Sequence, residues 1–228
     1  MGWKASTIII HEPTLVDNEQ LLKELGFTNL VPIKEETFEV AMNPDDNRVY
    51  IGTYRDNLLI CAPDIPLQFF GDTETAIEKI FNRLFPGSEI CSIVLHSVVN
   101  LWGYSVTVDA HKVRARAGSS DDGTSIEIGE PLEEEKELLS KSTVDENGIR
   151  TYLFDDFPDE PFNEDQVGEN FVFAICKRYF GEELDNADEL LFDTTLTGYK
   201  YGKVIQNEIN KQGEKLNTDN SKPWWKFW

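Results

Sequence analysis

One stretch of the sequence, residues 89–132, most constrains how this chain can fold. It opens with a mostly apolar run over residues 90–99, rich in β-branched side chains, which is typical of a strand buried on both faces. Residues 104–109 and 113–117 then alternate between apolar and polar side chains, and residues 124–128 form another strand-like segment. Polar residues and glycines separate these segments. The stretch therefore predicts a meander of about four antiparallel strands at the core of a sheet.

The rest of the sequence predicts further strands and three helices. Alternating or short apolar segments predict strands over residues 4–10, 36–42, 48–54, 58–62 and 149–154. Apolar side chains that recur on one face, between capping residues, predict helices over residues 17–25, 72–84 and 164–179. Residues 133–137 are expected to form a solvated helical turn or loop, and residues 155–165 an acidic loop. We therefore expect an α+β fold: a mainly antiparallel sheet of two meanders, with about three helices packed on it, in one domain over residues 1–202.

The net charge of -21 is the most unusual number in the composition. Nearly half of the 42 acidic side chains fall within residues 130–199, which hold 20 acids and 5 bases. Binding to nucleic acid or to an anionic membrane needs clustered Lys and Arg, so neither is expected. An acidic surface attracts a basic protein partner and speeds the encounter. Solubility alone is the alternative explanation of the charge.

Cys61, Cys91 and Cys176 stand singly in apolar segments. An odd number of isolated cysteines favours buried free thiols in a reducing compartment over a disulfide framework. Neither a secretory signal peptide nor an apolar run of the roughly 18 residues that a membrane span needs is recognisable. We therefore expect a cytoplasmic location.

The search for catalytic and metal-binding motifs yields one weak candidate. Nucleotide-binding glycine loops, a nucleophile elbow and a zinc-protease motif are absent from the sequence, and its three histidines lack metal-ligand spacing, so no metal or cofactor is expected. His96, followed by Ser97, interrupts an apolar strand and needs polar partners. One interpretation makes His96 a general base beside a carboxylate such as Glu130. The favoured interpretation makes it a largely buried, hydrogen-bonded histidine with a structural role.

Arg114 and Arg116 lie on one face of their predicted strand. Two such guanidinium groups can clamp an anionic ligand bidentately. The favoured alternative is that they pair with neighbouring acids on an exposed face. Both interpretations stay open at the level of sequence.

The last seven residues, 222–228, are the most distinctive local feature. Trp224, Trp225, Phe227 and Trp228 are costly to leave in water, because each offers about 150–250 Å² of surface worth about 25 cal/mol per Å² on burial. We expect a C-terminal aromatic motif that docks on a groove, following a flexible linker over residues 203–221. The groove belongs to a partner protein, to this chain, or to a second copy, which would give a homodimer through the tail. A membrane interface is the least favoured alternative, because seven residues are a weak anchor and the acidic body would be repelled.

Several short motifs carry a resemblance to a known family. They are the opening Met1-Gly2-Trp3-Lys4, then Leu95-His96-Ser97-Val98-Val99 with the nearby Trp102, and Ile128-Gly129-Glu130-Pro131-Leu132. In this order, over about residues 1–198, they resemble an uncharacterised family of bacterial proteins of unknown function. The resemblance implies no activity, cofactor or catalytic residue.

We therefore expect a non-catalytic acidic binding protein, such as an inhibitor or immunity-type partner of a basic protein. The binding residues would be the four aromatic residues of the tail, with Arg114 and Arg116. The alternative is a small-molecule hydrolase that uses His96 with nearby carboxylates.

Overall fold

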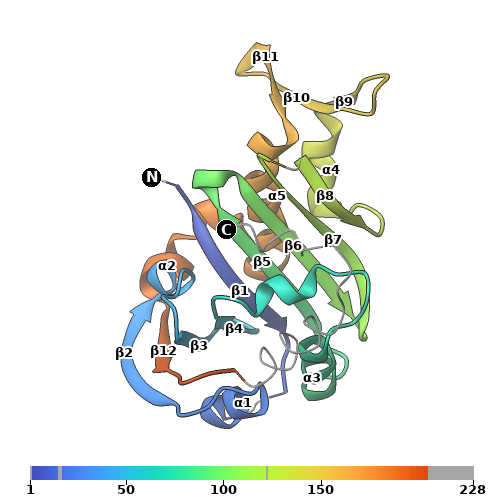
Figure 1. The fold of residues 1–228 in the computed structure, drawn as a ribbon. Helices are drawn as coiled ribbons and strands as arrows, with labels where there is room; N and C mark the ends of the chain where they lie inside the picture. Colours follow the sequence, from blue (N-terminus) through green and yellow to red (C-terminus); the bar gives the residue numbers. More distant parts are fainter. Residues whose placement is uncertain (1, 15–16, 122, 205–228) are drawn as a thin grey trace.

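The computed structural model describes residues 2–14, 17–121 and 123–204 (Figure 1). Its strands are β1 (Lys4–His11), β2 (Val31–Thr37), β3 (Arg48–Tyr54), β4 (Asn57–Cys61), β5 (Glu89–His96), β6 (Leu101–Val108), β7 (His111–Ser119), β8 (Gly123–Ile128), β9 (Ser142–Val144), β10 (Arg150–Phe154), β11 (Phe157–Asn163) and β12 (Thr195–Lys200). Its α-helices are α1 (Asn18–Glu24), α2 (Phe38–Ala41), α3 (Ala76–Leu84), α4 (Glu133–Ser140) and α5 (Glu164–Phe180). The fold is α+β, as expected from the sequence.

Nine strands form one antiparallel sheet in the order β2-β12-β3-β4-β1-β5-β6-β7-β8. The β5–β8 meander predicted from residues 89–132 is present in this sheet. The two predicted meanders are not separate, however, because β1 lies between β4 and β5 and pairs with both. Ile9 of β1, for example, stands opposite Leu59 on one side and Cys91 on the other. The first strand of the chain therefore joins both halves into a single sheet.

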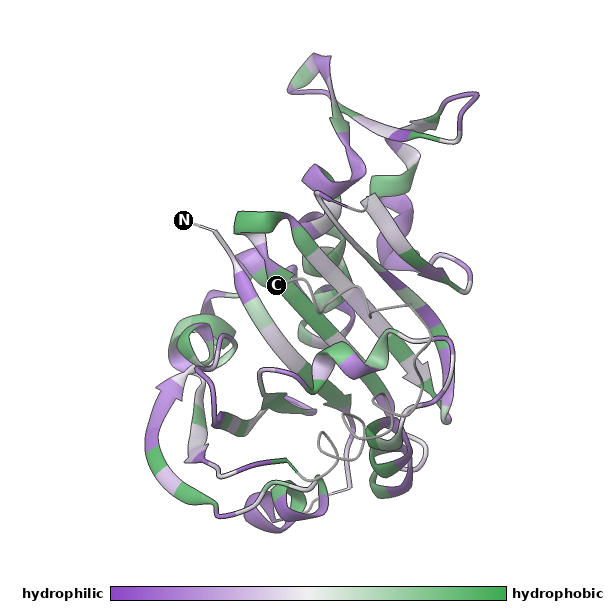
Figure 2. Cartoon of the chain, viewed as in Figure 1, coloured by the Kyte–Doolittle hydropathy of each residue, from purple (hydrophilic) through white to green (hydrophobic). Residues whose placement is uncertain are grey.

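Both faces of the sheet are covered. Side chains of α5, including Phe171 and Ile175, pack in the core on one face. Side chains of α1 and α3, including Leu22 and Phe81, pack in the core on the opposite face. The central strand β5 is consequently buried on both sides along most of its length and is mostly hydrophobic (Figure 2). This is the environment that its mostly apolar run predicts.

A second, three-stranded sheet in the order β11-β10-β9 projects from the main body, at the top of Figure 1. Residues 155–165, which we expected to form a loop, supply β11 and the first turn of α5. The two prolines of β11, Pro158 and Pro161, are tolerated because β11 is an edge strand and not every edge N–H is needed for pairing. The predicted acidic loop is thus an ordered edge of the projecting sheet.

Two other local predictions were correct only in part. Residues 36–42 were predicted as a strand, but Phe38–Ala41 forms α2, in which Phe38 and Ala41 are buried three positions apart while Val40 is exposed. The period-two pattern of these residues is also compatible with a helical turn, and tertiary burial decides between them. Residues 133–137 belong to α4, and Glu135 in this segment is buried rather than solvated. With α2 and α4, the described residues form five α-helices instead of three.

The main body extends slightly further than residue 202. The N–H of Thr28 donates a hydrogen bond to the carbonyl oxygen of Lys203 at 3.0 Å. Phe27 forms an isolated antiparallel bridge with Val204, which is buried. Residues 203 and 204 therefore belong to the folded body and not to a linker. The remainder of the predicted linker, and the aromatic motif, lie outside the described residues.

Candidate functional site

Arg114 projects from β7 into the protein interior, where its side chain is fully buried. Its Nε and Nη2 atoms donate hydrogen bonds to Oε1 and Oε2 of Glu135 at 2.9 and 2.6 Å. Nη2 also donates to Glu127 at 3.1 Å, and Nη1 donates to the carbonyl oxygen of Gly129 at 2.7 Å. Burial works to lower the pKa of Arg114, but the bonds to Glu135 and the surrounding charges outweigh it and raise the pKa, so the group stays charged.

Arg116 lies two residues further along β7 and is also fully buried. It forms an ion pair with Glu164, the first residue of α5. The guanidinium carbon lies 4.3 Å from the ring centroid of Phe171 and 5.5 Å from that of Trp102. Charge and aromatic contacts together hold this cation inside the fold.

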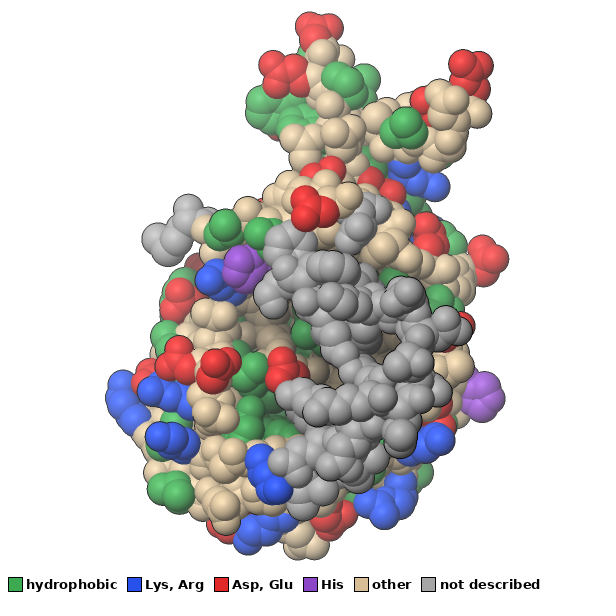
Figure 3. All heavy atoms as spheres, in the orientation of Figure 1, with side chains coloured by type: hydrophobic (Ala, Val, Ile, Leu, Met, Phe, Trp, Pro, Cys, Tyr) green, Lys and Arg blue, Asp and Glu red, His purple; other side chains and the backbone are tan. Residues whose placement is uncertain are grey.

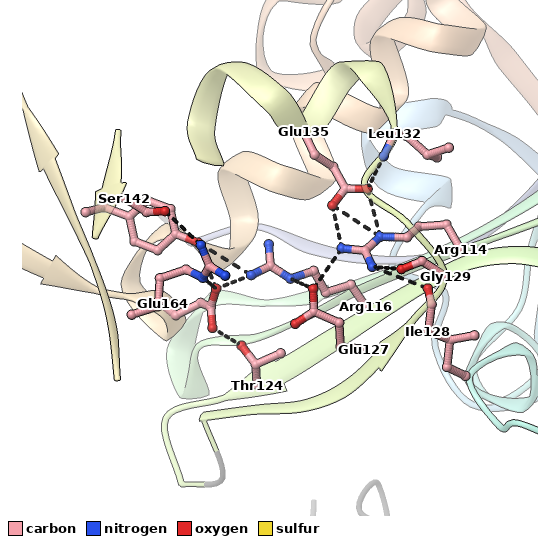
Figure 4. A network of polar contacts seen from close by, with 12 residues as sticks. Arg114, Arg116, Thr124, Glu127, Ile128, Gly129, Leu132, Glu135, Ser142 and Glu164 are labelled. Atoms are coloured by element: carbon pink, nitrogen blue, oxygen red, sulfur yellow. Dashed lines mark hydrogen bonds and ion pairs between the residues drawn. The ribbon is translucent and has the colours of Figure 1, made fainter. Parts of the chain in front are cut away.

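Glu164 is the meeting point of the network in Figure 4. Its carboxylate accepts hydrogen bonds from the hydroxyl of Tyr152 at 2.7 Å and from that of Thr124 at 2.5 Å. Arg150, which starts β10, lies 3.5 Å away. The network therefore connects the projecting sheet, through Tyr152 and Arg150, to strands β7 and β8 of the main sheet.

These contacts decide how the two sequence-predicted arginines are used. They pair with neighbouring acids, as the favoured interpretation held, but they do so in the interior and not on an exposed face. Both guanidinium groups are already paired with carboxylates inside the fold. Arg116 helps to attach the projecting sheet to the body through Glu164, whereas Arg114 ties β7 to α4 and β8. Ligand binding by either arginine stays a prediction.

His96 and Glu130 are not brought together. His96 ends β5 opposite Leu101, is half-buried, and has a buried Nδ1 atom with no hydrogen-bond partner among the described residues. This differs from the largely buried, hydrogen-bonded histidine of the favoured interpretation. Glu130 is exposed and follows β8 beyond the pairing of Ile128 with Ala115, towards the opposite end of the meander. The register separates the two by roughly 20 Å along the strands, at about 3.3 Å per residue. The catalytic pair of the hydrolase hypothesis therefore does not exist in this fold.

Ser97 is also committed to structural contacts. Its Oγ accepts a hydrogen bond from the backbone N–H of Trp3 at 2.8 Å and lies 2.7 Å from the carboxylate of Glu169. The hydroxyl fastens the start of the chain to α5. Among the described residues, no group of three or more His, Cys, Asp or Glu side chains is arranged to hold a metal ion.

The projecting sheet carries several exposed apolar side chains. A row of aromatic side chains runs along it: Tyr152 is buried against Phe171, with ring centroids 5.9 Å apart, and Phe162 contacts both Phe154 and Phe157. Phe157, at the outer end of the row, is 52% exposed. Three aliphatic side chains of this region, Val144, Ile149 and Leu153, are exposed as well. Water-facing apolar side chains gathered on one projection are typical of an interaction surface.

Acidic side chains lie beside these apolar residues at the ends of the projection (Figure 3, top). Residues 142–163 contain six exposed acids and a single base, Arg150, which turns towards Glu164: the acids are Asp145, Glu146, Asp155, Asp156, Asp159 and Glu160. Asp145 also shapes its turn, because its carboxylate accepts hydrogen bonds from the N–H groups of Ile149 and Asn147, which lower its pKa. The projection therefore combines apolar anchors with a strong negative potential. Sequence reasoning missed it, since Phe154, Phe157 and Phe162 converge only when β10 and β11 pair.

Comparison with known proteins places the chain in a family. A family model described as a family of unknown function, DUF6928, matches residues 15–152, which is more than half of the chain. The chain belongs to this family. The DUF6928 match includes Arg114, Arg116, Glu127 and Glu135, but it ends within β10 and before Glu164. Comparison with the curated proteins and with the solved structures gave no match.

Family membership agrees with the resemblance inferred from the sequence, to the extent that DUF6928 is a family of unknown function. The bacterial origin and the particular motifs stay predictions. None of the described helices has the length and apolar character to cross a membrane. The four aromatic residues of the tail lie outside the described residues, so their docking role also stays a prediction.

Proposed function

We propose that this protein is a non-catalytic binding protein whose projecting sheet, residues 142–163, docks on a basic protein partner. The observation that carries the proposal is the exposure of Phe157, Val144, Ile149 and Leu153 on the same projection as six exposed carboxylates. The acids would steer a basic partner to the surface and the apolar side chains would supply the binding energy. Aromatic anchors surrounded by a polar rim are the usual centre of such interfaces.

The attachment of the projecting sheet to the main body supports the same function. Binding surfaces that are fixed before the partner arrives lose less conformational freedom on association. Tyr152 and Arg150 fix the inner end of the projection to Glu164, and Glu164 is fixed in turn to Arg116. The buried network thus holds the docking surface in place. A reducing cytoplasm is the compartment we propose, on the strength of the three buried free thiols.

The test uses the full-length protein with a photo-crosslinking amino acid at position 157, in its native host. The control carries the same amino acid at Val31, which is similarly exposed but lies on β2, far from the projection in Figure 1. We expect one dominant partner of positive net charge from position 157 and none from position 31. A partner captured equally from both positions, or an acidic partner, would contradict the proposal.

The purified partner then provides the quantitative test. Reversing two of these charges, in Asp159→Lys/Glu160→Lys, should weaken binding at least tenfold at low salt, chiefly through slower association. Wild-type binding should also weaken as the salt concentration rises. If neither the two substitutions nor the salt concentration changed the affinity, the acidic side chains would not contribute to binding.

A further inference from the structure

A small cavity lies where the turn between β5 and β6 meets the first turns of α5. Its volume is about 120 Å³, and its walls are formed by Ser97, Asn100, Leu101, Trp102, Asp165, Gln166 and Glu169. A water molecule takes about 30 Å³ of liquid volume, so the space corresponds to about four water molecules. The cavity can therefore receive the end of a ligand, whereas a complete drug-sized molecule needs at least about 300 Å³.

Two carboxylates line this cavity from one face of α5. Asp165 and Glu169 are four positions apart, a spacing that places helical side chains next to each other. Polar contacts with the β5–β6 turn hold both in position: Nδ2 of Asn100 donates to Oδ2 of Asp165 at 2.9 Å, and Oγ of Ser97 lies 2.7 Å from Oε2 of Glu169. Neither carboxylate forms an ion pair with a cation in the described part of the chain. Like charges at this spacing repel each other, and a cation between them would remove the repulsion.

The indole N–H of Trp102 is an unsatisfied donor at the same place. Trp102 is 1% exposed, and its Nε1 atom is buried with no hydrogen-bond partner among the described residues. This nitrogen lies close to α5, because a Cβ atom at Gly168 would be only 2.1 Å from it. Gly168 shares a helix face with Asp165 and Glu169, so the indole nitrogen approaches α5 beside the two carboxylates. A buried donor without an acceptor costs free energy, which an acceptor brought by a ligand would recover.

We propose that this cavity binds the free N-terminus of a peptide. The α-ammonium group would lie between Asp165 and Glu169, and the first carbonyl oxygen would accept a hydrogen bond from Trp102. A lysine side chain would satisfy the carboxylates but not the indole, because its ammonium group has donors only. A peptide N-terminus carries an ammonium group and a carbonyl oxygen on adjacent carbon atoms, and capture of such termini is an established mode of peptide recognition.

This inference does not rest on the function proposed for the projecting sheet. None of residues 142–163 lines the cavity. The test therefore uses short peptides, which meet the cavity alone, and leaves every residue of the projection unchanged. A negative result would not count against the docking surface, and a failed search for a basic partner would not count against the cavity.

The test is an NMR titration of the isotope-labelled full-length protein, in which the indole N–H signal of Trp102 is followed. The probes are triglycine amide, the same peptide with an acetylated N-terminus, and methylamine. We expect triglycine amide to shift the Trp102 signal and to bind with a millimolar Kd, because few of its atoms enter the cavity. The acetylated peptide lacks the ammonium group and should bind at least tenfold more weakly. Methylamine lacks the carbonyl oxygen, so it should bind more weakly and shift the signal less.

Two double variants test the carboxylates. Asp165→Asn/Glu169→Gln should weaken the binding of triglycine amide at least tenfold. The control Asp72→Asn/Asp188→Asn removes the same charge at two exposed acids outside the cavity, and it should bind as the wild type does. Circular dichroism melting confirms that each variant is folded before it is titrated.

The proposal would be overturned if triglycine amide did not bind in the millimolar range, if the acetylated peptide bound equally well, or if both double variants lost the same affinity. Methylamine binding as tightly as the peptide, or a Trp102 signal that does not move when the peptide binds, would exclude the indole from the site. The cavity would then recognise an ammonium group alone, and its assignment to a peptide N-terminus would be wrong.

Discussion

Arg114 and Glu135 form an ion pair that is almost completely removed from water. Taking two charges out of solvent costs several kcal/mol each, so the pair adds little net stability over apolar residues of the same shape. Removing only one partner is different, because the other charge then stays buried and uncompensated. Loss of Arg114 is therefore costly mainly because the carboxylate of Glu135 would stay buried without its partner.

We predict that Arg114→Met lowers the free energy of unfolding by about 3–5 kcal/mol, since Glu135 would lose its main partner. Urea denaturation measures this change. The double variant Arg114→Met/Glu135→Leu should recover much of the loss. Lys136→Met, which breaks the exposed pair of Lys136 with Glu133, serves as the control and should change stability by at most about 1 kcal/mol. A single-variant loss no larger than that of the control would contradict the role given to the buried pair.

The three cysteines allow a second prediction at the residue scale. All are buried and unpaired, and burial raises the pKa of the Cys61 thiol to about 12. The thiolate is the reactive form, so we expect no labelling of the native protein by a thiol-specific disulfide reagent at pH 8. All three thiols should react once urea unfolds the chain. Rapid stoichiometric labelling of the folded protein would show that at least one thiol is accessible.

At the scale of elements, α5 is the helix that contacts both the main sheet and the projecting sheet. Asn163 caps it, Gly181 ends it in a left-handed conformation, and its first residue anchors the buried network. Gly168 lets the helix approach β6 closely, because a Cβ atom there would lie 2.0 Å from Cδ1 of Trp102. The position of α5 thus depends on a residue with no side chain.

We predict that Gly168→Ala destabilises the protein, although alanine is the better helix former. Overpacking of this kind typically costs about 1–3 kcal/mol, which exceeds the roughly 1 kcal/mol gained in helix propensity. Gly71→Ala is the matched control, because its added methyl group would meet nothing closer than 3.6 Å. Thermal melting of both variants decides the point, and equal melting temperatures would contradict the close approach of α5.

The other end of α5 is tied to β5 by charge. Arg178 donates hydrogen bonds to Glu89 at 2.5 and 3.0 Å, and the hydroxyl of Tyr179 donates to the same carboxylate at 2.7 Å. Burial acts to raise the pKa of Glu89, but these hydrogen bonds and the charge of Arg178 outweigh it, so the pKa is lowered. A lowered folded-state pKa stabilises the fold above the unfolded-state pKa, near 4.3, and this contribution disappears as the pH falls through the folded value.

We therefore predict that Glu89→Gln is less stable than the wild type at pH 7. The difference should shrink as the pH falls from about 4.3, where the unfolded chain takes up the proton, through the lower pKa of the folded carboxylate. Urea denaturation at pH 7 and between pH 3 and 5 tests the trend. A difference that does not depend on pH would mean that the contact acts through shape and not through charge.

At the scale of the whole molecule, charge is unevenly distributed. The projecting sheet is acidic, since residues 142–163 hold six exposed acids and one base. A cavity beside β12 is mixed in charge, because Lys4, Lys34, Arg48 and Lys200 line it together with Glu36, Asp45 and Asp46.

We predict that the outer end of the projecting sheet contributes little to the stability of the body. Asp159 and Glu160 are exposed and form no ion pair within the described residues, so Asp159→Lys/Glu160→Lys should change the free energy of unfolding by no more than about 0.5 kcal/mol per substitution. Denaturation in urea, compared with the wild type, measures this. A loss of several kcal/mol would show that these acids belong to the fold, and the binding test on the same variant could then no longer be interpreted as a surface effect.

The sequence by itself determined the β5–β8 meander, the caps of α1 and α5 and the burial of the cysteines, because these features follow from patterns of neighbouring residues. Tertiary structure alone decided three others: the pairing of β12 between β2 and β3, the helical form of residues 38–41, and the interior position of Arg114 and Arg116. Each of these depends on segments far apart in the chain, such as Arg116 with Glu164. Local periodicity does not show which distant carboxylate a guanidinium group will pair with. An arginine that pairs on the surface and one that pairs in the core therefore look the same in the sequence.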